Sequence, residues 1–301
     1  MEMASNMTGT LPPPELSPVI AGCWRMADWG WTPQERLRWI EQCLDRGVTT
    51  FDHADIYGGY TVEALFGEAL ALAPHLRERM QLVSKCGIRL HHPNRPEHRL
   101  KSYDTSAAHL VASVDHSLRA LRTDRLDLLL IHRPDPLMHP AEIAGAVAKL
   151  KAAGKLKDFG VSNFTMSQFA MLNPWVPLAT NQIELHPLHR APLHDGTLDQ
   201  MLALDLRPMI WSPLAGGRLF TGDAPDARRV RAVLDDVARR HGVTPATVAY
   251  AWLLRHPSRP RPIVGSRRIE ALDEALAAQA LTLDAETWHE IWSAGEGAEV
   301  A

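Results

Sequence analysis

Short runs of apolar residues recur along the chain, and each is followed by polar residues and then by a stretch with helical spacing. Within these runs almost every residue is apolar, whereas a strand with one face in water would alternate apolar and polar positions. Continuous runs of this kind are typical of parallel strands that are covered by helices on both faces. The pattern predicts eight strands, at residues 18–22, 48–52, 81–84, 127–131, 157–161, 178–182, 207–210 and 262–264.

Helical stretches separate these strands, and several have recognisable starts. Thr32 and Thr244 each precede a proline, which places a hydroxyl cap before proline at the first helical position. A further helix has apolar residues at positions 110, 114, 118 and 121, and its cap is Asp104, Thr105 or Ser106. The remaining predicted helices are residues 33–46, 62–72, 141–153, 166–172, 226–240 and 245–255, with a last helical region from 269 onward.

Eight strand–helix units in about 280 residues predict an α/β fold, a (β/α)8 TIM barrel formed as a single domain by residues 15–301. Residues 1–14 are rich in proline and small residues and are predicted to be a mobile tail. A doubly wound sheet is the alternative, but it normally has a glycine-rich loop after its first strand. Here Gly22-Cys23-Trp24-Arg25 stands at that place, and the sequence contains no GxGxxG motif.

Polar and ionisable residues directly follow the predicted strands. In a (β/α)8 barrel the active site lies at the carboxyl ends of the strands, so these residues are expected to surround one rim. They are Asp52, Tyr57, Lys85, His132, Ser162, Asn163, Gln182, Trp211, Ser212, Ser266, Arg267 and Arg268.

Four of these residues form a candidate proton-transfer group. Asp52 and Tyr57 alone fit a capped turn with an outward phenol, because strand ends are often polar. Lys85 and His132 change that interpretation. A cationic lysine lowers the pKa of a nearby phenol, a carboxylate can hold the lysine, and an imidazole can hydrogen-bond a substrate carbonyl.

Composition narrows the possible partners. The chain has 301 residues, 22% of them charged, a net charge of −3 and no basic stripe, which argues against nucleic acid or an anionic membrane as a partner. No apolar stretch approaches the roughly 18 residues of a membrane span, and the first residues lack the pattern of a secretory signal. Three cysteines without metal-type spacing predict reduced thiols and a cytoplasmic protein. No metal site is expected, because the loop histidines have no recognised ligand spacing: His91, His92, His98, His186, His189 and His194.

Seven motifs give the chain a family resemblance that extends from Gly22 to about Glu274. They are Phe51-Asp52-His53-Ala54-Asp55-Ile56-Tyr57-Gly58, Val83-Ser84-Lys85, Asp127-Leu128-Leu129-Leu130-Ile131-His132, Gly160-Val161-Ser162-Asn163-Phe164, Asn181-Gln182, Trp211-Ser212-Pro213-Leu214 and Val264-Gly265-Ser266-Arg267. In this order and at these spacings the chain resembles the aldo-keto reductases. The resemblance implies a barrel that uses NADPH to reduce aldehydes or ketones.

The resemblance also implies a role for individual residues. Tyr57 would be the general acid, tuned by Lys85 and Asp52, and His132 would orient the carbonyl. Ser162, Asn163 and Gln182 would hold the nicotinamide carboxamide, with Trp211 stacked on its ring. Ser212 and residues 214–218 would contact the pyrophosphate, Ser266 and Arg267 the 2′-phosphate, and Glu274 the adenine. The full set expected at the cofactor is Gly22, Cys23, Trp24, Asp52, Ser162, Asn163, Gln182, Trp211, Ser212, Leu214, Gly216, Arg218, Ser266, Arg267 and Glu274.

Two departures from the family pattern bear on the adenosine end. Ala271 and Ala275 stand where many relatives have arginine and asparagine, so NADPH preference would depend more on Arg267 and Arg268.

Other interpretations of single residues remain open at this point. Lys85 could form a Schiff base, as in a barrel aldolase. Trp211 could be rim packing, Ser162 and Asn163 a simple turn, and the two arginines a solvated pair. The whole chain could also be a non-catalytic, nucleotide-binding auxiliary subunit that senses redox state.

The substrate pocket is expected around Trp24 and residues 29–31, 87–104 and 133–139. The stretch at 87–104 is predicted to be a long polar loop, and loops of that length are often functional. The aromatic residues in this set favour an apolar or aromatic carbonyl compound. The sequence leaves the physiological substrate and the oligomeric state open.

Overall fold

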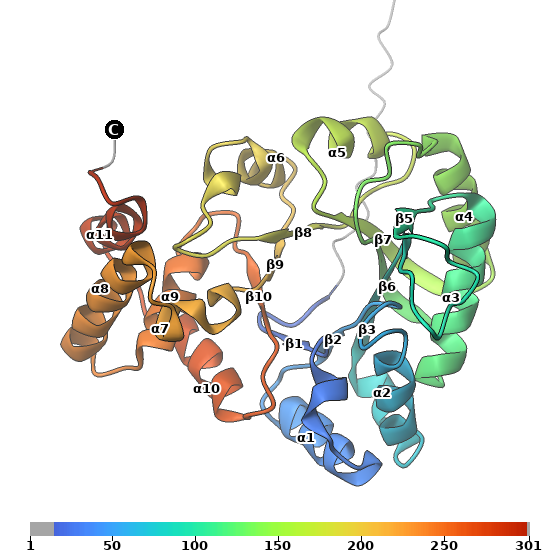
Figure 1. Cartoon of the computed structure of the whole chain (residues 1–301), viewed down its shortest axis with the longest axis horizontal. Helices are drawn as coiled ribbons and strands as arrows, with labels where there is room; N and C mark the ends of the chain where they lie inside the picture. The colour runs from blue at the N-terminus through green and yellow to red at the C-terminus, as the bar shows by residue number, and fades with distance from the viewer. Residues whose placement is uncertain (1–14, 300–301) are drawn as a thin grey trace, which may run out of the picture.

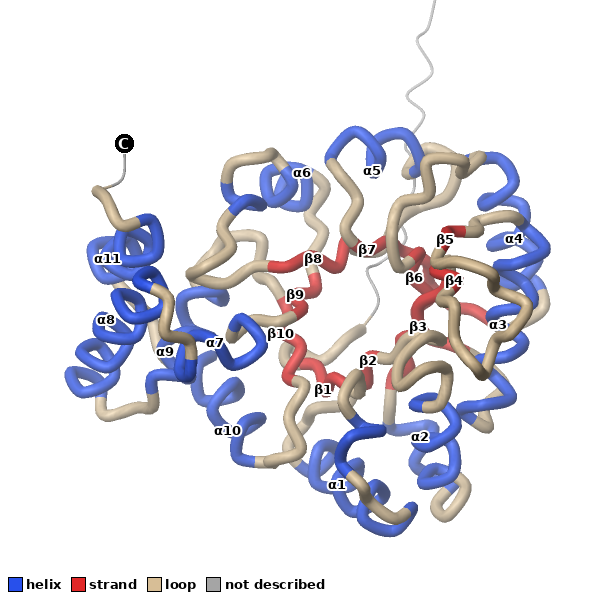
Figure 2. Tube along the Cα trace, viewed as in Figure 1, coloured by secondary structure: helices blue, strands red, loops and turns tan. Residues whose placement is uncertain are grey.

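The protein folds as a closed barrel of eight parallel strands, as the sequence pattern predicted. The structure, a computed structural model, describes residues 15–299. Figure 1 shows the strands as a central ring with the helices outside it, and Figure 2 shows the same separation by colour. Around the ring the strands are β1 (Ile20–Gly22), β10 (Arg261–Val264), β9 (Met209–Trp211), β8 (Asn181–Glu184), β7 (Leu156–Ser162), β6 (Leu126–Ile131), β3 (Gln81–Cys86) and β2 (Thr50–Asp52).

Apolar residues on opposite faces of the strands form two separate cores. On β6, Leu128 and Leu130 lie inside the barrel, while Leu129 and Ile131 pack toward the helices. The inner core is small, and the outer core between strands and helices contains most of the buried apolar residues. Burial of both faces explains why the strands appear in the sequence as continuous apolar runs.

The helices begin where the capping residues placed them. Thr32 and Glu35 form a reciprocal capping box at the first helix, and Thr244 accepts a hydrogen bond from the Thr247 backbone amide at another. Of the three candidate caps before the helix at 107, Ser106 is the N-cap, and its hydroxyl accepts from the backbone N–H of His109. The α-helices are α1 (Pro33–Asp45), α2 (Val62–Leu70), α3 (Ala107–Leu121), α4 (Pro140–Ala152), α5 (Met166–Leu172), α6 (Thr197–Ala203), α7 (Arg218–Thr221), α8 (Pro225–His241), α9 (Pro245–Leu254), α10 (Glu270–Ala277) and α11 (Ala285–Glu296).

The stretch expected to be a long polar loop contains a two-stranded hairpin. Strands β4 (Ile88–Arg89) and β5 (Ser102–Tyr103) pair antiparallel beyond the end of β3. Each has only two residues, so alternation could not reveal it. The backbone amide of Leu90 donates to the Tyr60 hydroxyl at 2.8 Å, which ties the hairpin to the segment after β2.

Several element boundaries also differ from the prediction. The sixth and seventh strands are shifted toward the carboxyl end, to Asn181–Glu184 and Met209–Trp211, because the polar ends of these strands still pair in the barrel. The first strand begins at Ile20 rather than at residue 18. The final helical region is divided into α10 and α11, and α11 lies against α8 (Figure 1). The predicted tail, residues 1–14, lies outside the described residues.

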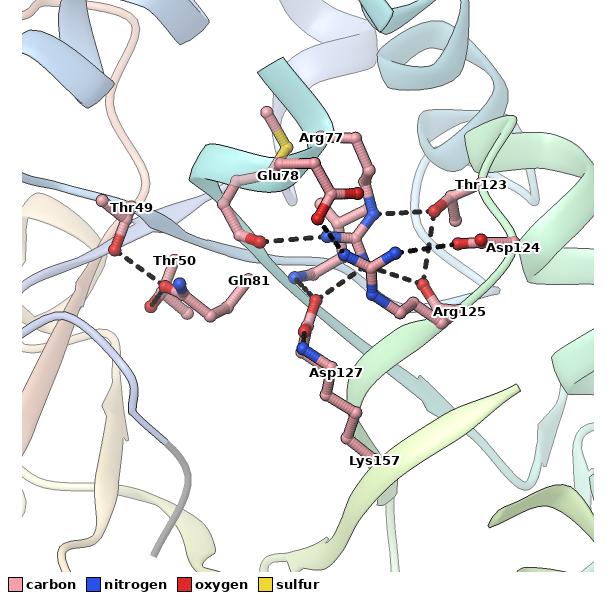
Figure 3. Close-up of polar contacts among 12 residues, drawn as sticks. Thr49, Thr50, Arg77, Glu78, Gln81, Thr123, Asp124, Arg125, Asp127 and Lys157 are labelled. Carbon is pink, nitrogen blue, oxygen red and sulfur yellow. Dashed lines mark hydrogen bonds and ion pairs between the residues drawn. The ribbon is translucent and has the colours of Figure 1, made fainter. Parts of the chain in front are cut away.

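Polar residues close the amino-terminal end of the barrel on one side. Figure 3 shows the Asp127 carboxylate between Arg77 and Lys157, whose nitrogens each lie 2.8 Å from a carboxylate oxygen. The same carboxylate accepts from the backbone amide of Leu82 at 2.9 Å, so one side chain at the start of β6 joins β3, β6 and β7. In a barrel of this type residues at this end serve stability rather than catalysis. Within residues 15–299, none of the helices is long and apolar enough to cross a membrane.

Candidate active site

A cavity of about 1270 Å³ opens at the carboxyl ends of the barrel strands. It extends from the segment after β2, across β6–β9, to the loop after β10. Most residues that sequence analysis expected at the site line it: Gly22, Trp24, Asp52, Tyr57, His132, Ser162, Asn163, Gln182, Trp211, Ser212, Leu214, Gly216, Ser266, Arg267 and Glu274. These residues come from seven of the strands or the segments that follow them, and they meet at one rim.

The centre of this rim is a buried ion pair. Lys85, at the end of β3, has no exposed surface, and its Nζ lies 2.9 and 2.8 Å from the two carboxylate oxygens of Asp52 on β2. The same ammonium donates to the His53 carbonyl at 2.7 Å and to the Tyr57 hydroxyl at 2.9 Å. Lys85 does not line the cavity itself. It contacts the hydroxyl of Tyr57, which does line the cavity.

Burial and the ion pair act in opposite directions on the pKa values of this group. Burial lowers the pKa of Lys85, but Asp52 and Tyr57 together outweigh it, so the pKa is raised and the amine stays protonated. Burial raises the pKa of Tyr57 above its ordinary value, although Lys85 acts to lower it. Lys85 does act to lower the phenol pKa, as the sequence indicated, but burial outweighs it and the net pKa is raised. The expectation omitted the cost of burying a phenolate.

Gln182 connects the opposite side of the barrel to the ion pair. Its Nε2 donates to Oδ1 of Asp52 at 2.8 Å, from β8 to β2. The Asp52 carboxylate thus accepts from both Lys85 and Gln182, which fixes its orientation. Asp52 and Gln182 are 130 positions apart in the chain, and no sequence pattern predicted that they would be hydrogen-bonded. Whether Gln182 also contacts a nicotinamide carboxamide stays a prediction.

His132 lies on the other side of Tyr57, at the end of β6. The two rings are 5.8 Å apart between centroids and nearly perpendicular, at 79°. Its Nδ1 is buried without a hydrogen-bond partner among the described residues, and the ring lines the cavity. Burial and then the positive charges of Lys85, Arg133 and Lys101 hold the pKa of His132 well below its ordinary value. The imidazole is therefore neutral at pH 7.

A chain of side-chain hydrogen bonds fixes Trp211 at the end of β9. Its Nε1 donates to Asn163 Oδ1 at 3.0 Å, and Asn163 Nδ2 donates to the Ser162 hydroxyl at 2.8 Å. The Ser162 hydroxyl in turn donates to the Gln182 carbonyl at 2.9 Å. Asn163 has a φ of +58°, in the left-handed region that asparagine tolerates better than most residues. One network therefore links the Trp211 indole, the Asn163 amide and the Ser162 hydroxyl, and all three residues line the cavity.

The loop after β9 has an unusual backbone. Ser212, Ala215, Gly216 and Gly217 all have positive φ values, and Gly217, at +101°, requires glycine. The 3₁₀ turn at Ala215–Gly217 lines the cavity together with Phe220 beyond it. Arg25, from the loop after β1, donates to the Gly216 carbonyl at 3.5 Å, so these two loops meet across the cavity.

The chemistry of the lining residues fits a dinucleotide phosphate. Arg267 and Arg268 supply cations beside the hydroxyl of Ser266, and neither arginine has an ion pair among the described residues. The small residues of the 215–217 turn leave room for a pyrophosphate, and Glu274 lies farther along the same cavity. An extended cavity with cationic and hydrogen-bonding side chains along it is what NADPH would require.

Two residues expected at the cofactor do not line the cavity. Cys23 is fully buried, and its backbone amide donates to the Asp52 carbonyl at 3.0 Å. Arg218 turns back onto its own loop, where Nε donates to the Ala215 carbonyl at 3.2 Å. Sequence analysis also missed lining residues that carry no motif, among them Arg25, Asp28, Phe220, Thr244 and Tyr250. Only the Thr244-Pro245 helix start marked any of these positions, and it indicated structure rather than a site.

Comparisons with known proteins agree with this geometry. The family model described as "Aldo/keto reductase family" matches residues 18–296. The chain is 49% identical to the uncharacterized oxidoreductase YcsN of Bacillus subtilis over 289 residues, 95% of this chain and 96% of the relative. It is 43% identical to a 6-dehydroglucose reductase of Agrobacterium fabrum over 290 residues, 95% and 97% of the two chains. A crystal structure of an aldo/keto reductase from Klebsiella pneumoniae in complex with NADP and acetate is similar in fold, with a TM-score of 0.76, 27% identity and coverage of 92% and 90%.

The chain belongs to the aldo/keto reductase family. It is an oxidoreductase that acts on carbonyl groups, and because aldo-keto reductases use NADPH, its cofactor is NADP. The family resemblance drawn from the seven motifs is thereby confirmed.

Proposed function

We propose that the chain reduces an aldehyde or ketone to an alcohol, with Tyr57 as the general acid that protonates the carbonyl oxygen. The observation that carries this proposal is the continuous contact from Asp52 through Lys85 to the Tyr57 hydroxyl, with Tyr57 and His132 both facing the cavity. NADPH, when bound, supplies the hydride that adds to the carbonyl carbon. The residues of the chain must then deliver one proton to the oxygen.

Tyr57 suits that task because of its protonation state and its neighbour. Its raised pKa keeps the phenol neutral at pH 7, so the proton is present when it is needed. The bond that breaks is the phenol O–H, and the bond that forms joins this proton to the substrate oxygen. The phenolate left behind lies 2.9 Å from the Lys85 ammonium, whose charge stabilises it. Asp52 and Gln182 hold that ammonium in place.

His132 is proposed to orient the carbonyl. The ring is neutral, so it carries one proton, and the buried Nδ1 has no acceptor within reach. The tautomer with the proton on Nε2 therefore fits the site best. In that form His132 donates a hydrogen bond to the same oxygen that Tyr57 protonates, without competing as an acid.

The cofactor contacts remain those implied by the family resemblance, with two exceptions. Ser162, Asn163 and Trp211 would meet the nicotinamide, and Ser266 and Arg267 the 2′-phosphate; the lining of the cavity supports these assignments. Cys23 and Arg218 would act only through the backbone or by shaping their loops, since neither side chain reaches the cavity.

The proposed direction is reduction of a small carbonyl compound. The 6-dehydroglucose reductase of Agrobacterium fabrum is 43% identical, which makes a sugar-derived aldehyde a candidate substrate for this chain as well. The sequence-based expectation of an apolar or aromatic compound remains the alternative. An auxiliary, non-catalytic subunit is less well supported, because all four proton-transfer positions are occupied by the required side chains.

The test is the Tyr57→Phe variant, assayed for NADPH oxidation with 4-nitrobenzaldehyde. General acid catalysis is worth about 10²–10⁴-fold, so kcat should fall by at least about 10² while NADPH affinity changes little. Tyr103→Phe is the matched control, since Tyr103 also lines the cavity but does not touch Lys85.

A Tyr57→Phe enzyme that keeps more than about a tenth of the wild-type kcat would contradict the assignment. The comparison of kcat values applies under conditions in which a deuterium isotope effect shows that hydride transfer limits the rate. Covalent trapping of substrate on Lys85 by borohydride would instead favour a Schiff-base lyase.

A further inference from the structure

The cavity carries an excess of positive charge at the end where the substrate must lie. Five cationic side chains line it, Arg25, Lys101, Arg133, Arg267 and Arg268, against the carboxylates of Asp28, Asp52 and Glu274. Arg267, Arg268 and Glu274 lie at the end proposed for the adenosine, and Asp52 is paired with Lys85. Arg25, Lys101 and Arg133 remain, against Asp28, and Arg25 donates to the Gly216 carbonyl. Lys101 and Arg133 are therefore the two of these cations whose side chains have no hydrogen bond or ion pair among the described residues.

Lys101 is placed there by the β4–β5 hairpin. It stands directly before β5, whose Tyr103 also lines the cavity. The hairpin is held at its base, because His98 Nδ1 lies 3.0 Å from the Leu90 carbonyl and the Leu90 amide donates to the Tyr60 hydroxyl. The Lys101 side chain has no hydrogen bond or ion pair within residues 15–299. A tethered loop thus presents an unpaired ammonium to the cavity.

Arg133 is placed by the end of β6, one residue after His132. Its guanidinium lies 5.8 Å from the centre of the Trp211 ring, and it too has no ion pair in the described part of the chain. Both Arg133 and Lys101 act on the His132 imidazole through their positive charge. Two unpaired cations therefore flank the residue that is proposed to orient the carbonyl.

We infer that Lys101 and Arg133 determine specificity by binding oxygen atoms of the substrate, so that the enzyme selects oxygen-rich carbonyl compounds, with hydroxyl or carboxylate groups near the carbonyl. This inference rests on the proposed function. Charge-assisted hydrogen bonds from a lysine or an arginine to such oxygens are strong, and an apolar substrate would leave both cations without a partner. Trp24, Trp29 and Tyr103 offer apolar faces for the carbon skeleton. A purely apolar or aromatic substrate stays the alternative to this class.

The experiment compares matched aldehydes in the wild type and in Lys101→Met and Arg133→Met. D-glyceraldehyde against propanal tests hydroxyl groups, and succinic semialdehyde against pentanal tests a carboxylate. We expect the wild type to prefer at least one oxygen-rich member by tenfold or more in kcat/KM, and each variant to lose about tenfold of that preference, the loss expected for one charge-assisted bond. Propanal and pentanal should change less than about threefold. Lys149→Met, an exposed lysine on α4 outside this cavity, is the control for net charge.

Binding is measured beside turnover, so that a failure of the proposed function stays distinguishable. Tryptophan fluorescence of the NADP-loaded protein reports the Kd of D-glycerate, which carries both kinds of oxygen group. Weaker glycerate binding in both variants, by about tenfold, supports the inference even for an enzyme that reduces no aldehyde tested. A wild type without preference for either oxygen-rich aldehyde, or variants that lose apolar and oxygen-rich substrates equally, would overturn it.

Discussion

The two sides of the barrel rim treat charge in opposite ways. On the β2–β3 side the ionisable groups are buried and bonded to one another, as Lys85 is to Asp52 and Tyr57. On the β9–β10 side Arg267 and Arg268 face the cavity without partners among the described residues, next to a loop with positive φ values. On the β2–β3 side, called the closed side below, the fold itself supplies a partner for each charge. On the β9–β10 side, called the open side, the arginines gain an anionic partner only when a ligand binds.

The contrast predicts that substitutions on the closed side affect catalysis and stability, whereas substitutions on the open side affect cofactor binding. A buried ion pair has a fixed geometry, but both charges are removed from water. Removing one partner leaves the other charge buried and unpaired, so both catalysis and stability are affected. Exposed cations contribute little to stability, because water screens them, and their effect appears on binding a phosphate. The same class of residue therefore has different mutational consequences on the two sides.

The largest effect is expected from Lys85→Met on the closed side. It removes the charge next to Tyr57, so kcat should fall at least about 10²-fold, and it leaves the Asp52 carboxylate buried without its cation, at a cost of about 3–5 kcal/mol. Steady-state kinetics and urea denaturation at pH 7 measure the two losses. Asp52→Asn with Lys85→Met should recover much of the stability and none of the activity. A double variant as unstable as Lys85→Met would show that the ion pair does not explain the loss.

A pH effect is expected from His53, also on the closed side. Both ring nitrogens are buried without partners among the described residues, the ring packs against Phe66, and burial lowers its pKa from 6.5 to about 3. The unfolded chain therefore binds a proton that the folded chain does not. Stability is full above pH 6.5 and falls as the pH drops toward 3, by about 3 kcal/mol between pH 6.5 and pH 4.

Replacing His53 by leucine should remove this dependence. Urea denaturation of both proteins from pH 7 to pH 4 gives the difference in unfolding free energy, which should shift by about 3 kcal/mol in favour of the variant. Glu63, whose burial raises its pKa to about 6, has the opposite dependence but is common to both proteins. Parallel curves for the two proteins would show that His53 does not titrate as its burial implies.

On the open side, Arg267→Ala should affect binding and leave stability unchanged. One charge-assisted bond to a 2′-phosphate is typically worth about 1.5–3 kcal/mol, so NADPH should bind roughly tenfold or more weakly while NADH is nearly unaffected. Fluorescence titration with both nucleotides measures this. Arg38→Ala, an exposed arginine on α1, is the control. Equal losses for both nucleotides would place Arg267 away from the 2′-phosphate.

The smallest effect is expected at Trp211, which lies on the open side at the end of β9. If its indole stacks on the nicotinamide, Trp211→Ala should weaken NADPH binding by around 1 kcal/mol and remove much of the fluorescence quenching that NADPH causes. Trp175→Ala, a tryptophan that is 57% exposed and outside the cavity, should leave the quenching as it is. Unchanged quenching in Trp211→Ala would assign the indole to rim packing.

The closed side was the easier one to predict from sequence. Asp52, Lys85 and His132 each follow a continuous apolar run, and the geometry of a barrel then brings strand ends together. What the sequence could not give was the result of burial, as at Tyr57, where desolvation exceeds the effect of Lys85. Nor could it give contacts across the barrel, such as that from Gln182 to Asp52.

Elements without periodicity were also missed. The hairpin strands β4 and β5 have two residues each, and α6, with seven residues, begins at Gly196 without a side-chain cap. The position of Lys101 at the cavity depends on that hairpin, so the inferred substrate class became visible only with the structure. Helices with complete caps, such as α1 at Thr32, were predicted closely because a local interaction fixes where they start.

Far from the cavity, Trp252 on α9 and Trp288 on α11 form a parallel pair. Their rings are 5.1 Å apart at an angle of 8°, and each indole N–H donates to the backbone carbonyl of the other residue. Two aromatic chromophores held this close and this nearly parallel couple their electronic transitions. The pair should therefore contribute to the near-ultraviolet circular dichroism of the protein, beside the close tryptophan contacts at Trp29 and Trp292. The difference spectrum between the protein and its Trp252→Phe variant would isolate that contribution and so report whether the last helix is packed on the barrel.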